Sequence, residues 1–286
     1  MFKLIKFELY KMSRRPRTYI GIIAFIVINF LVALGIAKTG LGDIANYGAN
    51  ATAGLQIIGS PKNAVFVLWS VVGSFFSGPF LIMLLPFFTA MVFGEIYAGE
   101  SLDGSFRTLL SRPVSRQAVI SAKIIASIIY TIVLLLVLGL SAYIIGWIWF
   151  GRGDLIATGT LFHPMLAIYP EGEALVRVLM CLGMNLLYLL CVGMIAFFIS
   201  VWFSNPIGAI GGSIMLSITT VIISGIPYFK NVKDYFFGSH ALDGQIMFLN
   251  PIPVKEVHTS IAVLGIYVIV FSLLSYFSIL RKDIVA

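Results

Sequence analysis

The chain has 286 residues, of which 59% are hydrophobic and only 11% are charged, and its mean hydropathy is +1.02. A soluble domain is about half apolar and about one quarter charged, so this composition excludes an ordinary soluble protein and predicts a chain solvated by lipid. The net charge of +7 does not indicate a nucleic-acid partner, because the basic residues stand at the ends of apolar runs instead of forming a stripe among exposed aromatic residues.

The apolar runs predict a single membrane domain that covers residues 1–286. A helix needs roughly 20 apolar residues to cross a bilayer. Six runs reach this length, and they cover residues 18–37, 64–94, 118–150, 174–203, 206–227 and 260–280. The fold class expected is therefore an all-α membrane protein with six transmembrane helices. The first run follows a basic leader as a signal peptide does, but it is too long for one and five more runs follow, so we expect it to be retained.

Residues 1–17 precede the first run and alternate apolar with charged residues at helical spacing. The apolar positions are Phe2, Ile5, Leu9 and Met12, and the charged ones between them are Lys3, Lys6, Glu8 and Lys11. This pattern predicts an interfacial helix that lies in the headgroup region. Its expected anchors at the turn into the membrane are Arg14, Arg15 and Arg17. A frayed basic leader is the alternative interpretation.

Two junctions have distinctive sequences. The run 64–94 exceeds the length of a straight span, and it contains Gly73, Gly78, Pro79 and Pro86, which favour a break. The fourth and fifth runs are separated by almost nothing. Ser204 or Asn205 can cap a helix that begins at Pro206, which predicts a tight helical hairpin.

The distribution of basic residues predicts the orientation. One set of segments holds twelve Lys or Arg: 1–17, 95–123, 204–205 and 281–286. The other set is longer but holds only seven: 38–63, 151–177 and 228–259. The positive-inside rule then predicts that both termini lie in the cytoplasm, with the protein in the cell inner membrane.

Residues 95–123 form the only long charged segment on the predicted cytoplasmic side. Between Gly104 and Pro113 there is room for about two helical turns, and Ser115 can cap the long helix that follows. A short helix across the membrane face would suit the docking of a cytosolic partner. A solvated loop is the alternative that the residues alone leave open.

This segment resembles a known family. The positions that carry the resemblance are Glu100, Gly104, Thr108–Leu110, Pro113–Arg116 and Lys123. They are similar to the permease subunits of ATP-binding-cassette exporters of the second type. The resemblance implies that residues 100–116 are a coupling segment that rests on an ATPase subunit. The contact residues it implies are Glu100, Asp103, Gly104, Arg107, Thr108, Leu109, Arg112 and Arg116.

The resemblance also implies the partners and the cargo. Family members work as two permease copies, or a copy and a paralogue, with two ATPase subunits that bind ATP and Mg. It further implies that residues 228–259 form an outer re-entrant loop. The apolar spans favour a hydrophobic or amphipathic substrate. A subunit that passes force to an outer partner without transport shares all of these features.

No chemistry of catalysis is expected in the chain itself. There is no Gly-Lys dipeptide, so a phosphate-binding loop is excluded and we expect no enzyme activity and no bound cofactor. The histidines His163, His240 and His258 fall in predicted outer loops without metal-ligand spacing, so no metal site is expected. Gradient-driven transport is the second hypothesis. It would require a charge deep in a span, whereas Glu95, Lys123 and the Glu173–Arg177 pair are expected near interfaces.

Overall fold

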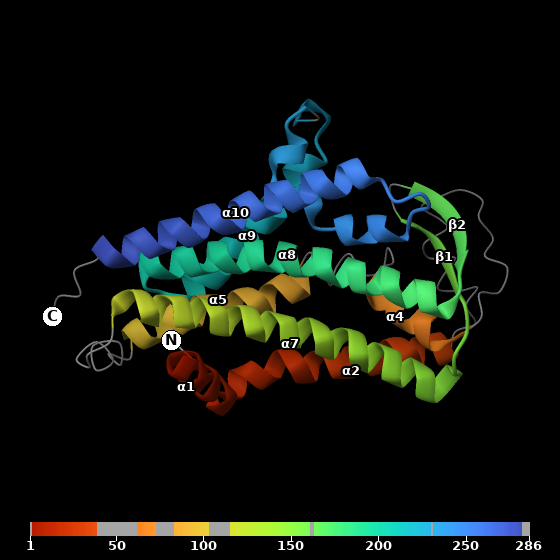
Figure 1. Cartoon of the computed structure of the whole chain (residues 1–286), viewed down its shortest axis with the longest axis horizontal. Helices are drawn as coiled ribbons and strands as arrows, with labels where there is room; N and C mark the ends of the chain where they lie inside the picture. Colours follow the sequence, from red (N-terminus) through yellow and green to blue (C-terminus); the bar gives the residue numbers. More distant parts are fainter. Residues whose placement is uncertain are drawn as a thin grey trace.

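The computed structural model describes residues 2–38, 62–72, 83–102, 115–160, 163–229 and 231–281. Within them the chain is mainly helical. Its helices are α1 (Phe2–Arg14), α2 (Pro16–Lys38), α4 (Ala64–Val72), α5 (Leu85–Leu102), α7 (Arg116–Phe150), α8 (Glu171–Phe203), α9 (Pro206–Ser224) and α10 (Val254–Arg281). The long helices run side by side along the longest axis of the molecule (Figure 1).

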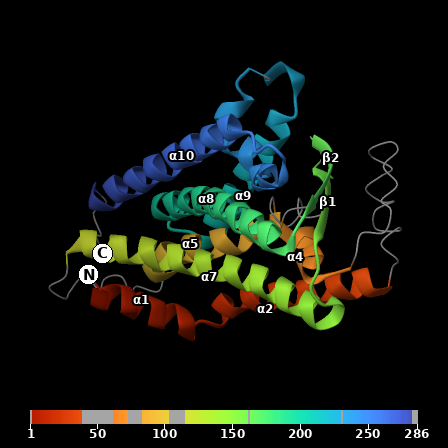
Figure 2. The same cartoon turned by 45° about the vertical axis from the view of Figure 1, so that its right-hand side comes forward.

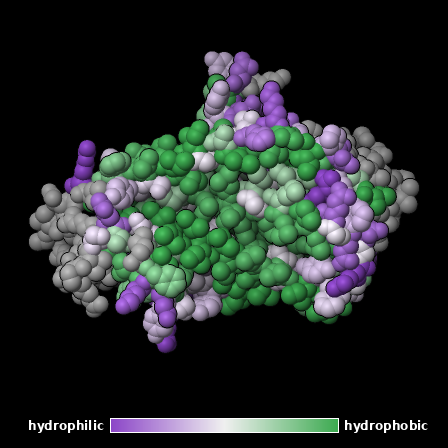
Figure 3. Space-filling view, viewed as in Figure 1, coloured by the Kyte–Doolittle hydropathy of each residue, from purple (hydrophilic) through white to green (hydrophobic). Residues whose placement is uncertain are grey.

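Five of these helices are long and apolar enough to cross a membrane: α2, α7, α8, α9 and α10. The surface agrees with this assignment. Apolar side chains cover the middle of the face shown in Figure 3, and hydrophilic side chains gather toward its two ends. The described part of the chain is therefore that of a helical, membrane-embedded protein, as the composition predicts.

The second predicted span is divided between two described helices. α4 ends at Val72, and α5 begins at Leu85 after a short π-helical turn at residues 83–84. Residues 73–82 lie outside the described residues, so the break predicted there is not described. Pro86 is the second residue of α5.

The predicted hairpin between the fourth and fifth runs is confirmed. α8 ends at Phe203, and Ser204 follows in the left-handed conformation with φ 50°. The Asn205 side chain then accepts hydrogen bonds from the backbone N–H groups of Ile207 and Gly208, at 3.0 and 3.3 Å. Pro206 is the first residue of α9, so the cap and the fixed φ of proline start the new helix at once.

The sequence did not predict the β-hairpin that joins α7 to α8. Strands β1 (Leu155–Thr160) and β2 (His163–Tyr169) pair antiparallel, with Leu155 opposite Tyr169 and a bulge between Thr158 and Thr160. The hairpin projects at one end of the helices (Figures 1 and 2). The all-α expectation therefore needs correction in this segment.

After the C-terminal end of α9 the chain forms four short 3-10 helices: η3 (Pro227–Phe229), η4 (Lys233–Tyr235), η5 (Phe237–His240) and η6 (Asp243–Phe248). η5 packs on α9, and η6 packs on α8. α10 begins at Val254, six residues before the predicted sixth run. We call η3 to η6 with the β-hairpin the outer cap, after the side of the membrane on which the sequence analysis expects them.

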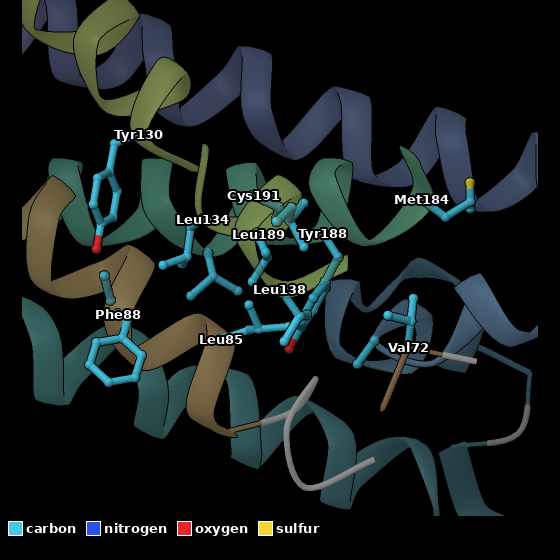
Figure 4. Packing of buried hydrophobic residues seen from close by; sticks show 14 of the residues in the cluster. Val72, Leu85, Phe88, Tyr130, Leu134, Leu138, Met184, Tyr188, Leu189 and Cys191 are labelled. Atoms are coloured by element: carbon cyan, nitrogen blue, oxygen red, sulfur yellow. The ribbon is translucent and has the colours of Figure 1, made fainter. Parts of the chain in front are cut away.

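α8 is the central helix, with 61% of its most apolar window buried inside the protein. Buried side chains of α5, α7 and α8, among them Leu85, Leu138 and Tyr188, form one continuous core around it (Figure 4). α5 packs closely on α8 at Gly193, where a Cβ atom would lie 2.8 Å from the ring of Phe93. The absence of a side chain at Gly193 thus lets these helices meet without a gap.

Candidate functional site

The side of α1 that faces the protein is charged. Glu8 is only 3% exposed, Met12 is buried, and Lys11 and Arg15 are partly buried. These residues recur at helical spacing and so form one row. The sequence pattern, which placed Glu8 and Lys11 among the charged positions of the helix, did not predict that these two side chains turn toward the protein.

Lys123 of α7 lies at the centre of the ionic groups that α1 meets. Its Nζ atom lies 2.6 Å from Glu100 Oε2 and 3.2 Å from Glu8 Oε1, and it also donates to the carbonyl oxygen of Ile96 at 3.2 Å. All three of its hydrogens are thereby used. The side chain of Lys123 is only 1% exposed, so its charge is enclosed by protein groups and is not in contact with water.

A second row of pairs surrounds this centre. Lys11 Nζ lies 2.5 Å from Glu100 Oε1, and Arg15 lies 4.0 Å from the same oxygen. Glu95 accepts from Arg17 at 2.9 Å, with Arg15 at 3.7 Å. We call these seven side chains the ionic cluster: Glu8, Lys11, Arg15, Arg17, Glu95, Glu100 and Lys123. It carries four positive and three negative charges, so nearly every buried charge is compensated.

The electrostatics keep Glu100 ionised. Burial by itself raises the pKa of this carboxyl group, but Lys123 and Lys11 outweigh that effect and hold its pKa below the ordinary value. A carboxylate that stays ionised with hydrogen-bond donors on both oxygens is a fixed point of attachment. The ionic cluster is thus suited to fastening helices together, not to moving protons.

The ionic cluster lies at both ends of the segment that the resemblance singles out. Glu100 is two residues before the end of α5, and Lys123 is in the second turn of α7. Residues 103–114, which connect these helices, lie outside the described residues. Where the described chain resumes, Ser115 caps α7 by accepting a hydrogen bond from the Ala118 N–H at 3.3 Å, as predicted. The ionic cluster therefore clamps α5 and α7 to α1 at the base of this connection.

The implied contact residues are brought together only in part. Six of them lie outside the described residues: Asp103, Gly104, Arg107, Thr108, Leu109 and Arg112. Arg116 is the first residue of α7, and its side chain is not described. Glu100 faces the interior, and each of its oxygens accepts a hydrogen bond from a lysine, at the point where the segment leaves α5.

The three expected membrane anchors also differ from one another. Arg15 and Arg17 turn toward Glu95, so they anchor the chain to the protein. Arg14 is exposed, donates to Tyr10 Oη at 3.2 Å, and lies over the Tyr10 ring at 5.3 Å. The signal that sequence reasoning missed is Glu8, which is the only acidic residue in the first 42 positions. A lone acid in a basic helix indicates a specific partner.

The outer cap contains a second set of polar contacts, centred on Arg177. The predicted pair with Glu173 is present at 2.8 Å, but Arg177 is also buried under the outer cap. It donates to the carbonyl oxygens of Met247 and Leu249 at 2.9 and 3.0 Å, and its guanidinium lies 4.2 Å from the centre of the Tyr169 ring. Arg177 thereby joins α8, η6 and β2.

His240 of the outer cap is fully bonded. Its Nδ1 atom lies 2.6 Å from Asp243 Oδ2, and its Nε2 atom lies 2.9 Å from the Asp234 carbonyl oxygen. Ser260 donates to the same Asp243 oxygen. Because the aspartate and not the histidine lies between the other two groups, and because both imidazole nitrogens are engaged, this is not a nucleophile with its base. The described residues also contain no group of three or more ligands that could hold a metal ion.

Comparison with known proteins relates the chain to a family. A family described as a protein of unknown function (DUF2705) matches residues 55–285. The chain belongs to this family. The match contains Glu100 and Lys123 but begins after α1 and α2. The chain is also similar to the uncharacterized protein YhcI of Bacillus subtilis (strain 168), with 29% identity over 232 residues that cover 78% of this chain and 71% of the relative.

Proposed function

We propose that this chain is the membrane-spanning subunit of an ATP-driven exporter, a permease of the ATP-binding-cassette type that couples a separate ATPase to the export of a hydrophobic or amphipathic substrate. The observation that supports this proposal most is the ionic cluster. It fastens α1, α5 and α7 together at the base of residues 103–114, the segment that bears the resemblance to a coupling helix.

A coupling segment has to pass force without losing it. A flexible base would absorb a displacement of residues 103–114 before it reached the spans. Lys123 and Glu100 join the two helices at this base through a pair of 2.6 Å, in a place closed to water, where salt screens little. Movement of the segment would then displace α5, α7 and α1 together, and α5 would displace the central helix α8 on which it packs.

In the proposed topology α4 and α5 make up one further crossing, which with the five long helices gives six spans. α1 lies at the cytoplasmic face of the inner membrane, both termini are cytoplasmic, and residues 228–259 are on the outer side as a re-entrant loop. The twelve Lys or Arg on the cytoplasmic side against seven on the other support this orientation.

The proposed complex holds two permease subunits, identical or related, and two copies of the ATPase. ATP and Mg bind to the ATPase. Arg107, Arg112 and Arg116 supply the positive charge that meets it, with Asp103, Gly104, Thr108 and Leu109 beside them. A version of the same complex that transmits force to an outer partner without transport uses the same coupling segment.

Gradient-driven transport is a second candidate because the structure has what the sequence did not show, a fully buried lysine with two carboxylates. Proton coupling requires a group that changes its protonation near neutral pH. Each oxygen of Glu100 accepts a hydrogen bond from a lysine, Lys11 on one side and Lys123 on the other, and these bonds stabilise the ionised form. This favours a clamp over a proton relay.

The test is affinity purification of the tagged, full-length protein in mild detergent, followed by identification of co-eluting chains and an ATPase assay. We expect a partner that carries a phosphate-binding loop, in stoichiometric amount. The variants Arg107→Glu and Arg112→Glu should lose most of the partner and of the ATPase stimulation, because they place negative charge where the contact is basic.

Lys233→Glu is the matched control, since it makes the same charge change in the exposed outer cap and should co-purify normally. A protein that elutes alone, with uptake or export that collapses on addition of a protonophore, would replace this proposal with the gradient-driven one.

A further inference from the structure

The exposed side of α1 is more basic than the sequence of the whole helix suggests. Because Glu8 and Lys11 turn inward to the ionic cluster, the outward side keeps three cations and no acid. The cations are Lys3, Lys6 and Arg14. Between them stand three exposed aromatic residues, namely Phe2, Phe7 and Tyr10, which are 83%, 46% and 57% exposed.

These cations are not neutralised by the protein. Among the described residues, neither Lys3 nor Lys6 nor Arg14 has a carboxylate within ion-pair distance. The hydrogen bond and the ring contact of the Arg14 guanidinium are both with Tyr10. α1 is also held in a fixed orientation. Its inward row is tied to α5 and α7 through Glu100 and Lys123, and α1 lies beside α7 at the edge of the helices (Figure 2), so its other side faces outward.

We infer that the outward side of α1 binds the headgroups of anionic phospholipids. Phosphate oxygens would be bound by Lys3, Lys6 and Arg14, while the rings of Phe2, Phe7 and Tyr10 would enter the boundary between headgroups and acyl chains. Charge complementarity selects this occupant. An anionic lipid surface meets both requirements, because its headgroups match the cations and its acyl boundary takes the rings, whereas a zwitterionic lipid would match the rings but not the charge. This inference is independent of the proposed transport function.

The size of the selectivity follows from the number of cations. Each Lys or Arg near an anionic lipid surface favours it by about a factor of five. Since the three cations share a few headgroups, we expect at least a fivefold preference for an anionic over a zwitterionic phospholipid beside α1.

The experiment uses a dye on α1 and lipids that quench it. The native cysteines, Cys181 and Cys191, are both fully buried, so a thiol-reactive dye will label an introduced Ser13→Cys on the exposed side of α1. The labelled full-length protein is reconstituted in phosphatidylcholine vesicles that contain equal small fractions of brominated phosphatidylglycerol or brominated phosphatidylcholine. Quenching by each lipid then measures its local concentration.

We expect quenching by brominated phosphatidylglycerol to show at least a fivefold local enrichment over brominated phosphatidylcholine. Neutralising the surface by Lys3→Gln, Lys6→Gln and Arg14→Gln together should reduce the enrichment to less than twofold. The matched control neutralises three cations outside α1, through Lys62→Gln, Lys233→Gln and Lys255→Gln, and should keep the enrichment. Equal quenching by the two lipids in the unmodified surface, or an enrichment that survives neutralisation of α1, would overturn the inference.

Discussion

Replacing Lys123 by methionine tests the ionic cluster most directly. Methionine keeps the length and the apolar stem of the side chain but removes the ammonium group. Lys123 Nζ holds Glu100 at 2.6 Å and Glu8 at 3.2 Å. After Lys123→Met, Glu100 keeps Lys11, whereas Glu8 has no other ion pair among the described residues. The substitution thus isolates one buried carboxylate.

The magnitude follows from the burial of Glu8. Its side chain is 4% exposed, so water cannot replace the lost partner. Breaking a buried ion pair from one side costs about 3 to 5 kcal/mol, because the remaining charge is uncompensated. Replacing both partners by apolar residues is far less costly. We therefore expect Lys123→Met to lower the free energy of unfolding by about 3 to 5 kcal/mol, and Glu8→Met with Lys123→Met to recover at least about 2 kcal/mol of it.

The assay is unfolding of the purified protein in mild detergent by increasing fractions of a denaturing detergent. Labelling of Cys181 and Cys191 reports unfolding, because both thiols are buried in the native state. Lys3→Met is the control on the exposed side of α1 and should change stability by less than about 0.5 kcal/mol. The reasoning is refuted if Lys123→Met costs less than about 1 kcal/mol, or if the double variant is no more stable than the single one.

Two further predictions concern packing and pH. Gly193→Ala should destabilise the protein by about 1 to 3 kcal/mol, because the new Cβ atom would lie 2.8 Å from the Phe93 ring. Gly183→Ala is the control on the same helix. A Cβ atom at Gly183 would meet nothing within 4 Å, so this variant should be neutral or stabilised by up to about 1 kcal/mol in the same assay. For His240, burial lowers the pKa, but the bond to Asp243 outweighs it and the pKa is raised. The protonated form therefore stabilises the fold below the unfolded pKa, and this contribution is lost as the pH rises through the folded pKa, so protease protection of the outer cap should fall as the pH rises above the ordinary histidine pKa of about 6.5. His240→Gln should remove that dependence, and an equal fall in the variant would contradict the assignment.

The features that sequence reasoning predicted well depend on local or additive properties. Each span is a sum of transfer free energies along about 20 residues, so its existence is visible without neighbours. The cap at Asn205 and the start of α9 at Pro206 rest on side chains that bond to their own backbone. The pair of Glu173 and Arg177 lies within one helix, at a spacing of four residues.

The features that it missed depend on contacts between distant segments. Glu8 and Lys123 are 115 residues apart, and Lys11 and Glu100 are 89 apart. On the pattern of α1 alone, charged residues belong on the water side. They turn inward because α5 and α7 offer charges of opposite sign. The periodicity within α1 contains no information about those charges.

The sequence by itself thus determined that the chain is solvated by lipid, which of its segments are apolar enough to cross a membrane, and the likeness of residues 100–116 to a coupling segment. Only the tertiary structure decided which charges are buried, which side of α1 faces outward, and that Glu100 is a point of attachment at the base of that segment. The physical reason is range. Hydropathy and capping act along the chain, whereas the state of a charge is set by every group within a few ångströms, and folding alone brings those groups together.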